Sequence, residues 1–343
     1  MVHLNPESPG ETWAKVRDIA AVLANKVERI ELPKVPAAHL NSIVEQMANS
    51  PISRLSRVSA ASIGTAKDPL NLSILAQVQG LKELKIKSVS SEPHLSMMNF
   101  DSGLNEMLAN SKASLLKLSL VSLDCINFKH LDVIANFKNL EVLELGDCTL
   151  LQGSDLFSKL IPLSGHLKEL RLERSIVGSD IGTLEHFEKL VSLELIDVEL
   201  KAGFGQGLVK LWKISKLMLI PTYKDEVATT NSKIVNSVRR LTGLTFFVLG
   251  LTNEWLASMN VPMSEDKPNS NNTKGDENFP INVNGGMRLI SLQKLFKALA
   301  GALPSAQVKI LKMPASATTK QRISNWASSV TAAPSNEPVL PGK

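Results

Sequence analysis

A short leucine phrase recurs along the chain and constrains its fold more than any other feature. In NLEVLELGDCTLL, residues 139–151, apolar side chains stand at Leu140, Leu143 and Leu145, then at Cys148 and Leu150. Spacings of three and two fit neither the 3.6-residue period of an α-helix nor the alternation of a half-exposed strand. Related phrases begin at residues 27, 55, 81, 115, 167, 190, 214 and 244.

Successive copies of this phrase begin about 23 to 34 residues apart, which is close to the period of a leucine-rich repeat. Over roughly residues 26–255 the chain resembles the leucine-rich repeat superfamily, most nearly its cysteine-containing and ribonuclease-inhibitor-like members. The family phrase is L-x-x-L-x-L-x-x-N/C-x-L, and only the copy at 140–150 has an Asn or Cys at the ninth position. The resemblance implies an α/β solenoid, a horseshoe or arc with parallel strands on its concave face and helices on its convex face.

The physics of the phrase predicts the same architecture. Each L-x-x-L-x-L segment is a short strand whose leucines can be buried only against the neighbouring copies, so stability is a sum of adjacent interfaces. Strands stack about 4.8 Å apart, whereas packed helices need about 10 Å, so the array must curve with its strands on the inside.

Five regions follow from composition and periodicity. We expect an N-terminal capping helix within 1–26, repeats over 27–255, a polar and disordered insertion over 256–290, a helix-strand cap over 291–314 and a disordered tail over 315–343. Between the strands, the apolar spacing predicts helices at 37–48, 128–137, 154–162, 183–188 and 227–240. The terminal cap is predicted to contain a helix at 291–303 and a strand at 308–313.

The register of the repeat predicts which side chains face the concave surface. This surface is expected to be of mixed charge in its middle and apolar towards its C-terminal end. An apolar patch rimmed by charge would bind a protein partner, or it would be covered by the insertion or tail of the chain itself. The predicted partner-binding residues are Lys85, Lys87, Glu144, Asp147, Arg171, Glu173, Glu194, Ile196, Met218, Ile220, Phe246 and Val248.

Composition and charge indicate a cytoplasmic or nuclear protein. Two cysteines, Cys125 and Cys148, have no pairing framework or metal-ligand spacing and are expected to be reduced and packed in apolar columns. The N-terminus lacks the pattern of a signal peptide, and no apolar run is long enough to span a bilayer. The net charge is +5, with 38 Lys and Arg residues interleaved with 33 Asp and Glu residues, which argues against nucleic acid as the partner.

The sequence predicts no catalytic, metal or cofactor site. Its six histidines are scattered without the i, i+4 spacing of a helix-borne metal site, and His130 and His186 are expected to be surface or partly buried residues of helical segments. Gly203, Gly205 and Gly207 in KAGFGQGLVKLW imitate part of a dinucleotide fingerprint. The next strand follows too soon for a βαβ unit, so we interpret these glycines as a flexible turn between repeats.

A long curved surface without catalytic residues predicts a protein-protein interaction scaffold or a substrate-recognition domain. The irregular repeats resemble those of F-box leucine-rich-repeat proteins, and this resemblance implies presentation of a substrate within a ubiquitin ligase complex. In that family an F-box precedes the repeats, whereas only a short segment precedes Trp13, so we expect either a fragment or a relative without an F-box. The alternative is a regulatory module for a GTPase or a nucleic-acid-associated complex.

Overall fold

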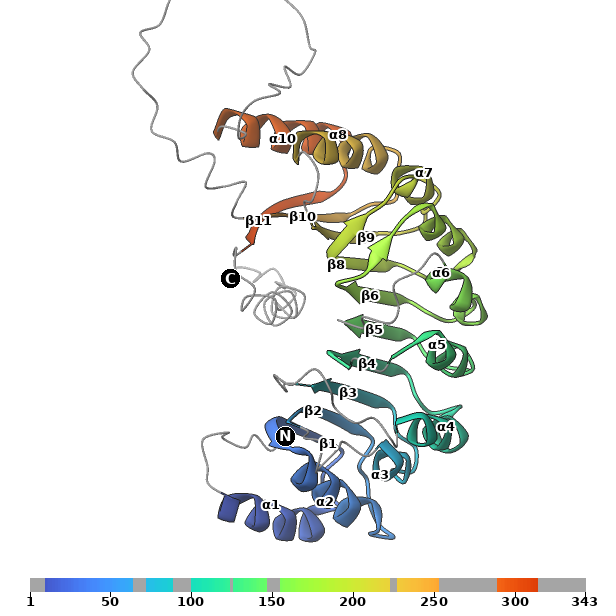
Figure 1. Ribbon diagram of the computed structural model, residues 1–343, viewed down its shortest axis with the longest axis vertical. Coiled ribbons are helices and arrows are strands. Elements are labelled where there is room, and N and C mark those ends of the chain that lie inside the picture. Colours follow the sequence, from blue (N-terminus) through green and yellow to red (C-terminus); the bar gives the residue numbers. More distant parts are fainter. Residues whose placement is uncertain are drawn as a thin grey trace, which may run out of the picture.

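Parallel strands form one open sheet along the whole arc (Figure 1). The computed structural model describes residues 10–63, 72–88, 100–123, 126–146, 155–222, 227–252 and 289–313. Within these ranges ten strands lie side by side in chain order, and a short eleventh strand, β7 (Ile176–Val177), pairs beside β8. The ten are β1 (Arg29–Pro36), β2 (Arg57–Ile63), β3 (Glu83–Ser88), β4 (Lys117–Val121), β5 (Val142–Gly146), β6 (Glu169–Glu173), β8 (Ser192–Leu200), β9 (Lys216–Pro221), β10 (Phe246–Thr252) and β11 (Gln307–Met313).

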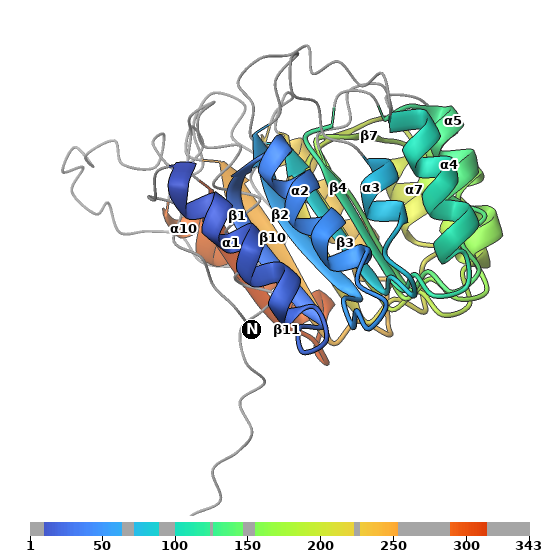
Figure 2. The same cartoon turned by 90° about the horizontal axis from the view of Figure 1, so that it is seen from below.

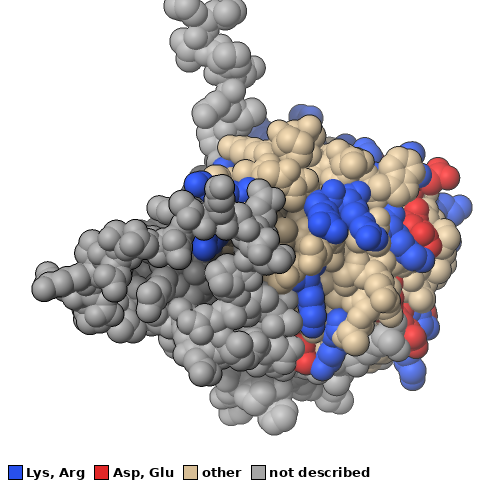
Figure 3. Space-filling model, turned by 90° about the horizontal axis from the view of Figure 1, so that it is seen from above, with Lys and Arg blue, Asp and Glu red and all other residues tan. Residues whose placement is uncertain are grey.

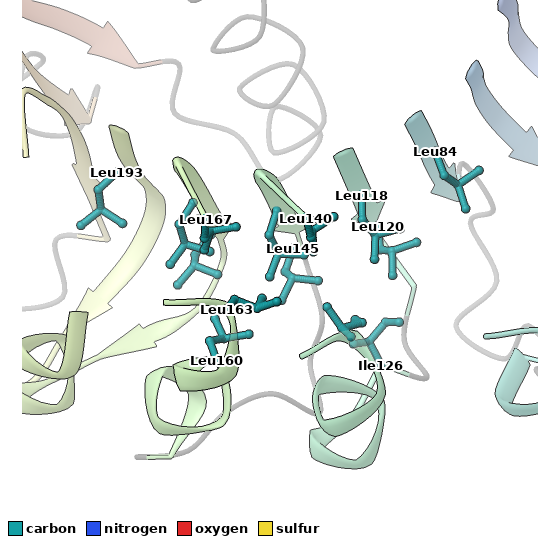
Figure 4. Packing of buried hydrophobic residues seen from close by; sticks show 14 of the residues in the cluster. Leu84, Leu118, Leu120, Ile126, Leu140, Leu145, Leu160, Leu163, Leu167 and Leu193 are labelled. Atoms are coloured by element: carbon teal, nitrogen blue, oxygen red, sulfur yellow. The ribbon is translucent and has the colours of Figure 1, made fainter. Parts of the chain in front are cut away.

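The register of this sheet stacks equivalent leucines of successive repeats into ladders. Leu118 on β4 pairs with Leu143 on β5, which pairs with Leu170 on β6, and each of the three is at most 1% exposed. A second ladder, two residues further along each strand, contains Leu120, Leu145 and Leu172. Figure 4 shows the ladders facing the helical side of the arc, where residues such as Ile126 and Leu160 pack against them. The recurring phrase therefore builds one continuous core, as the sequence predicts.

Helices cover the convex side of the sheet and the two ends of the arc (Figures 1 and 2). Because helices need more lateral room than strands, the sheet curves with its uncovered face inward. The described helices are α1 (Gly10–Leu23), α2 (Ala37–Ala48), α3 (Leu72–Ala76), α4 (Phe100–Ser111), α5 (Phe128–Ile134), α6 (Leu156–Lys159), α7 (Phe204–Leu208), α8 (Val227–Val238) and α10 (Leu289–Ala302), with 3-10 helices η2 (Ile161–Leu163) and η3 (Ser179–His186).

A left-handed residue follows β4 and β6 and interrupts the pairing of β8. Ser122, Arg174 and Asp197 have φ values of 56°, 53° and 51°, and they occupy the same position of their repeats, directly after the residues paired in the main sheet. The amide of Ser122 donates to the carbonyl oxygen of Gly146 at 2.8 Å, and the amide of Arg174 donates to that of Ile196 at 2.9 Å. The strained conformation turns the chain towards the convex layer while its backbone amide still bonds to the next repeat.

Several predicted elements are confirmed and others are wrong. The helices α2 and α8 and the strand β11 match predictions at 37–48, 227–240 and 308–313 closely, and α10 matches that at 291–303. The helix predicted at 154–162 is instead two short helices, α6 and η2, and the one predicted at 183–188 is the 3-10 helix η3. The helices α3, α4 and α7 were not predicted. Their segments are short, or contain glycine and polar residues that weaken the helical period.

Two further expectations concern single residues. His130 is buried. Its Nδ1 accepts a hydrogen bond from the Asn127 amide at 3.0 Å, which caps the start of α5. It therefore has a structural role that the sequence analysis missed, whereas His186 is exposed as expected. The cysteines Cys125 and Cys148, most of the predicted insertion (up to residue 288) and the predicted tail lie outside the described residues.

Candidate interaction surface on the concave face

The sheet register assigns the concave side chains to rows that cross the strands. The central row contains one residue from every strand of the path: Glu31, Ser59, Lys85, Ser119, Glu144, Arg171, Glu194, Met218, Val248 and Lys309. The next row towards the strand ends contains Ala61, Lys87, Val121, Gly146, Glu173, Ile196 and Ile220. Eleven of the twelve predicted partner-binding residues are therefore on the concave face, ten in these two rows and Phe246 one pleat nearer the start of β10. The twelfth, Asp147, lies outside the described residues.

An ion network in the middle of this face is centred on Arg171. The Nε atom of Arg171 lies 3.2 Å from Glu144 Oε1, and its Nη1 lies 3.3 Å from Glu194 Oε2. Its Nη2 is 3.9 Å from Glu173 Oε2, and Glu173 is also within 3.6 Å of Arg174. These three carboxylates belong to three adjacent strands, so the one guanidinium joins three repeats. Because the arginine remains charged and its donors are fixed in a plane, it suits this role better than a lysine.

Glu144 is held in its charged form by several neighbours. Burial raises the pKa of this carboxyl, but the charges of Arg171 and Lys85 and a hydrogen bond from Ser119 outweigh burial and leave the pKa below its usual value. The Ser119 hydroxyl donates to Glu144 Oε2 at 2.6 Å, and Lys85 Nζ lies 3.8 Å from the same oxygen. Glu144 thus connects the strands β3 to β6 through its partners.

The pKa values of two other groups are shifted in the direction that favours the neutral form. Burial raises the pKa of Glu194, and the charges of Glu144 and Glu169 add to this, with Arg171 opposing them. Burial likewise lowers the pKa of the Lys87 amine, where Glu173 opposes the shift and Lys85 strengthens it. The network therefore combines one carboxyl group whose pKa is lowered with a carboxyl and an amine whose pKa values are shifted towards the neutral form.

Burial corrects the expectation that these charged residues form an open surface. Glu173 is 1% exposed, and Glu144 and Arg171 are 7% and 9% exposed. Their charges neutralise each other across the strands, which allows them to be buried. Lys85 keeps 39% of its side chain exposed, and Lys87 is half-buried.

The predicted apolar patch is not an exposed patch in this structure. Ile196, Met218, Ile220 and Val248 are 0–3% exposed and pack together as a small second core, with Phe246 half-buried beside them. Lys309 on β11 places its Nζ 5.2 Å from the centre of the Phe246 ring. The sequence left two alternatives open, a patch that binds a partner and a cluster covered by the chain itself. The burial of these side chains agrees with a covered cluster. The segments named as its cover, the insertion up to residue 288 and the tail, lie outside the described residues.

The ion network was not predicted from the sequence, although the pattern that produces it is present there. Glu144, Arg171 and Glu194 occupy the same position of three consecutive copies, and a parallel register places such residues side by side. Towards the N-terminal end of the same face, charged residues such as Glu31, Lys85 and Lys87 are only partly buried. Arg29 pairs with Glu31 at 2.5 Å, and Arg57 Nε lies 3.9 Å from Glu83 Oε2.

The described residues contain no group of three or more His, Cys, Asp or Glu side chains arranged to hold a metal ion. Among the helices in the same part of the chain, none has the length and apolar character needed to cross a membrane.

The parallel sheet, its register and the stacked leucine phrases define a leucine-rich repeat solenoid. The chain is similar to the leucine-rich repeat-containing protein LegL7 from Legionella pneumophila, with a TM-score of 0.46 and 13% identity over 98% of each chain. It is also similar to an internalin (InlF) from Listeria monocytogenes, with a TM-score of 0.37 and 11% identity over 89% of each chain. For TLR13 in its complex with ssRNA13, the TM-score is 0.38 and the identity 15%, over 62% of this chain and 30% of that chain. No family model matches the chain, and no curated protein matches its sequence.

Proposed function

We propose that this protein is a protein-protein interaction scaffold that binds its partner on the concave face of the repeat arc. The open sheet offers a continuous side-chain surface across many strands, which is how solenoids form extended binding sites. The exposed part of this surface carries both signs of charge at fixed positions. Such a pattern gives specificity for a partner with complementary charges.

The observation that carries this proposal is the way in which Lys85 is held. Its ammonium group is directed by the buried carboxylate of Glu144, which is itself fixed by Arg171 and Ser119. An exposed charge that is already positioned loses less conformational entropy when a partner binds. We therefore assign Lys85 and Lys87 to direct contact with the partner. Glu144, Arg171, Glu173 and Glu194 are assigned to positioning them.

This assignment narrows the surface that the sequence predicts. The four apolar residues Ile196, Met218, Ile220 and Val248 are buried, so they are left out of the proposed contact surface. In their place we add the exposed Arg57 and the half-buried Glu83, which are paired in register at the starts of β2 and β3, the latter being the strand of Lys85.

The specific form of the proposal is a substrate-recognition domain of a ubiquitin ligase complex. It rests on the resemblance of the irregular repeats to those of F-box leucine-rich-repeat proteins. It predicts that subunits of a ligase are recovered together with the chain from its native cell. A regulatory module for a GTPase or a nucleic-acid-associated complex is the alternative, and recovery of a GTPase or of such a complex without ligase subunits would support it.

A charge swap within one ion pair tests the proposed surface. In the double variant R57E/E83R the pair and the net charge are kept, but the pattern that a partner meets is inverted. The matched control is E141K/K168E, a pair at 2.7 Å whose residues directly precede β5 and β6 and so lie outside the strands. In a cross-linked pull-down from the native cell, we expect the first swap to reduce recovery of the bound protein by about tenfold and the control to leave it unchanged. Equal recovery with both variants would place the partner elsewhere.

A further inference from the structure

The C-terminal end of the arc has a charge composition unlike that of the rest of the chain. The described residues 200–222, 227–252 and 289–313 contain eleven of the 38 Lys and Arg residues and none of the 33 Asp and Glu residues. Among the described residues, the interleaving of charges noted for the whole sequence therefore does not extend to this end of the arc. Figure 3, which views this end from above, shows Lys and Arg side chains on a surface otherwise formed by uncharged residues, with Asp and Glu towards one side.

Most of these cations have no carboxylate neighbour within the described parts of the chain. Lys201 and Lys210 pair with Glu199 and Glu185 of earlier segments. The other cations of known exposure are all exposed, and no carboxylate of a described residue lies within 4.0 Å of them: Lys213, Lys216, Lys233, Arg239, Arg240, Lys294, Lys297 and Lys309. Concentrated charge of one sign attracts a polyanion and raises its rate of association.

An exposed indole lies among these cations. Trp212 is 59% exposed in the turn before β9, and Lys213 places its Nζ 5.3 Å from the centre of the indole ring. The next repeat packs directly on this turn. A Cβ on Gly243 would lie 2.7 Å from the Trp212 carbonyl oxygen, and the Thr245 amide donates to the Ser215 carbonyl at 2.8 Å.

That contact brings a second pair of cations to the same edge of the sheet. Arg239 and Arg240 directly follow α8 and precede the turn at Gly243. Lys216 begins β9, which directly follows the turn that contains Trp212. We call Trp212, Lys213, Lys216, Arg239 and Arg240 the basic edge. It belongs to the last repeats and is separate from the ion network of the central strands.

We propose that the basic edge binds single-stranded nucleic acid. Cationic side chains contact the phosphates and supply affinity that depends on salt. The exposed indole can stack on an unpaired base, which a duplex does not offer. An acidic peptide would use the cations but lacks the bases that stack on Trp212. An anionic membrane is disfavoured because the apolar group here is one indole on a turn and not an apolar helix face.

The test measures binding of a fluorescently labelled single-stranded oligonucleotide of about 20 nucleotides to the full chain by anisotropy. With several phosphates bound, we expect the affinity to fall roughly tenfold or more between 50 and 200 mM salt. The variant W212A, which keeps every charge, should weaken binding by about tenfold. The triple variant K213E/R239E/R240E should weaken it at least as much. Unchanged thermal unfolding of each variant would show that the fold is intact.

A matched control separates a local site from net charge. Lys112, Lys138 and Lys189 are exposed in the corresponding turns of earlier repeats, and K112E/K138E/K189E changes the net charge by the same amount. We expect this control to weaken binding less than twofold. Equal loss in both triple variants, a W212A variant that binds like the wild type, or binding to phosphatidylserine vesicles but not to the oligonucleotide would each overturn the proposal. None of these results bears on the concave face, which is probed by different residues.

Discussion

Arg171 Nε lies 3.2 Å from Glu144 Oε1, and the two residues are paired in register on the adjacent strands β6 and β5. Arg171 is paired on its other side with Glu194 of β8. An arginine between two carboxylates on the inner wall of the arc joins repeats that are otherwise held together by leucine ladders and backbone hydrogen bonds. Because all three groups are largely buried, the balance of their charges affects both stability and the positions of the exposed neighbours.

Removing the central cation should destabilise the fold strongly. In R171M the carboxylates of Glu144 and Glu194 lose their shared partner while remaining buried, and we expect a loss of about 3–5 kcal/mol in the free energy of unfolding. The triple variant R171M/E144L/E194L removes the charges together and should recover most of that loss. Urea unfolding measures both. A loss below about 1 kcal/mol in R171M would contradict the importance of the network.

The two glutamates beside Arg171 should respond to pH in opposite directions. The pKa of Glu144 is lowered, so its contribution to stability is present above the usual Glu pKa and is lost as pH falls through the lowered value. E144Q should therefore be destabilising at pH 7 and nearly neutral in acid. The pKa of Glu194 is raised, so its contribution is present below the usual pKa and is lost as pH rises through the raised value.

E194Q resembles the protonated form of Glu194 and should be at least as stable as the wild type at pH 7, with the difference vanishing in acid. Unfolding free energies from pH 3 to pH 8 compare the two variants. Parallel pH profiles for E144Q and E194Q would show that the carboxylates are not distinguished in this way.

Two adjacent leucines distinguish the core from the surface. Leu115 is fully buried, whereas Leu116 is 37% exposed. L115A creates a cavity in the ladder and should cost about 2–5 kcal/mol. L116A serves as the control and should cost less than about 1 kcal/mol. Denaturant unfolding checks the pair, and similar losses for both would be incompatible with the layered core.

Gly207 is required by close packing and not by nucleotide binding. A Cβ at this position would lie 2.6 Å from both Ile181 Cγ2 and the Ser179 carbonyl oxygen. G207A should therefore destabilise the protein by about 1–3 kcal/mol or more. G301A in α10 is the control, since no atom lies within 4 Å of its new Cβ, and alanine should favour the helix by up to about 1 kcal/mol. Thermal unfolding of the two variants should shift in opposite directions.

The repeat phrase predicted the sheet well because every strand has the same pattern of apolar residues. Leucines at the first, fourth and sixth positions of a copy must be buried, and only stacked parallel strands bury all of them. The segments between strands have a weaker apolar periodicity. The short helices α3 and α7 are stabilised by packing against neighbours more than by their own sequence, so their periodicity was too weak to predict them.

The concave rows could also be predicted, because Lys85, Glu144 and Arg171 follow directly from the register. Their burial could not, since it depends on whether charges on neighbouring strands meet within ion-pair distance. The glycines at 203–207 were interpreted correctly as belonging between repeats. The prediction of a flexible turn was wrong, however, because Gly203, at φ 81°, caps the helix α7, and Gly205 and Gly207 lie within that helix, with Gly207 packed against η3.

The central claim is that a protein partner binds the concave face, and site-specific photo-cross-linking tests it most directly. A photoreactive amino acid at position 85 would report on the concave face, and one at position 132, on the exposed surface of α5, would report on the convex face. We predict that the partner is cross-linked from position 85 and not from position 132. Cross-linking from position 132 alone would show that the partner binds the helical side, and the proposed function of the concave face would be wrong.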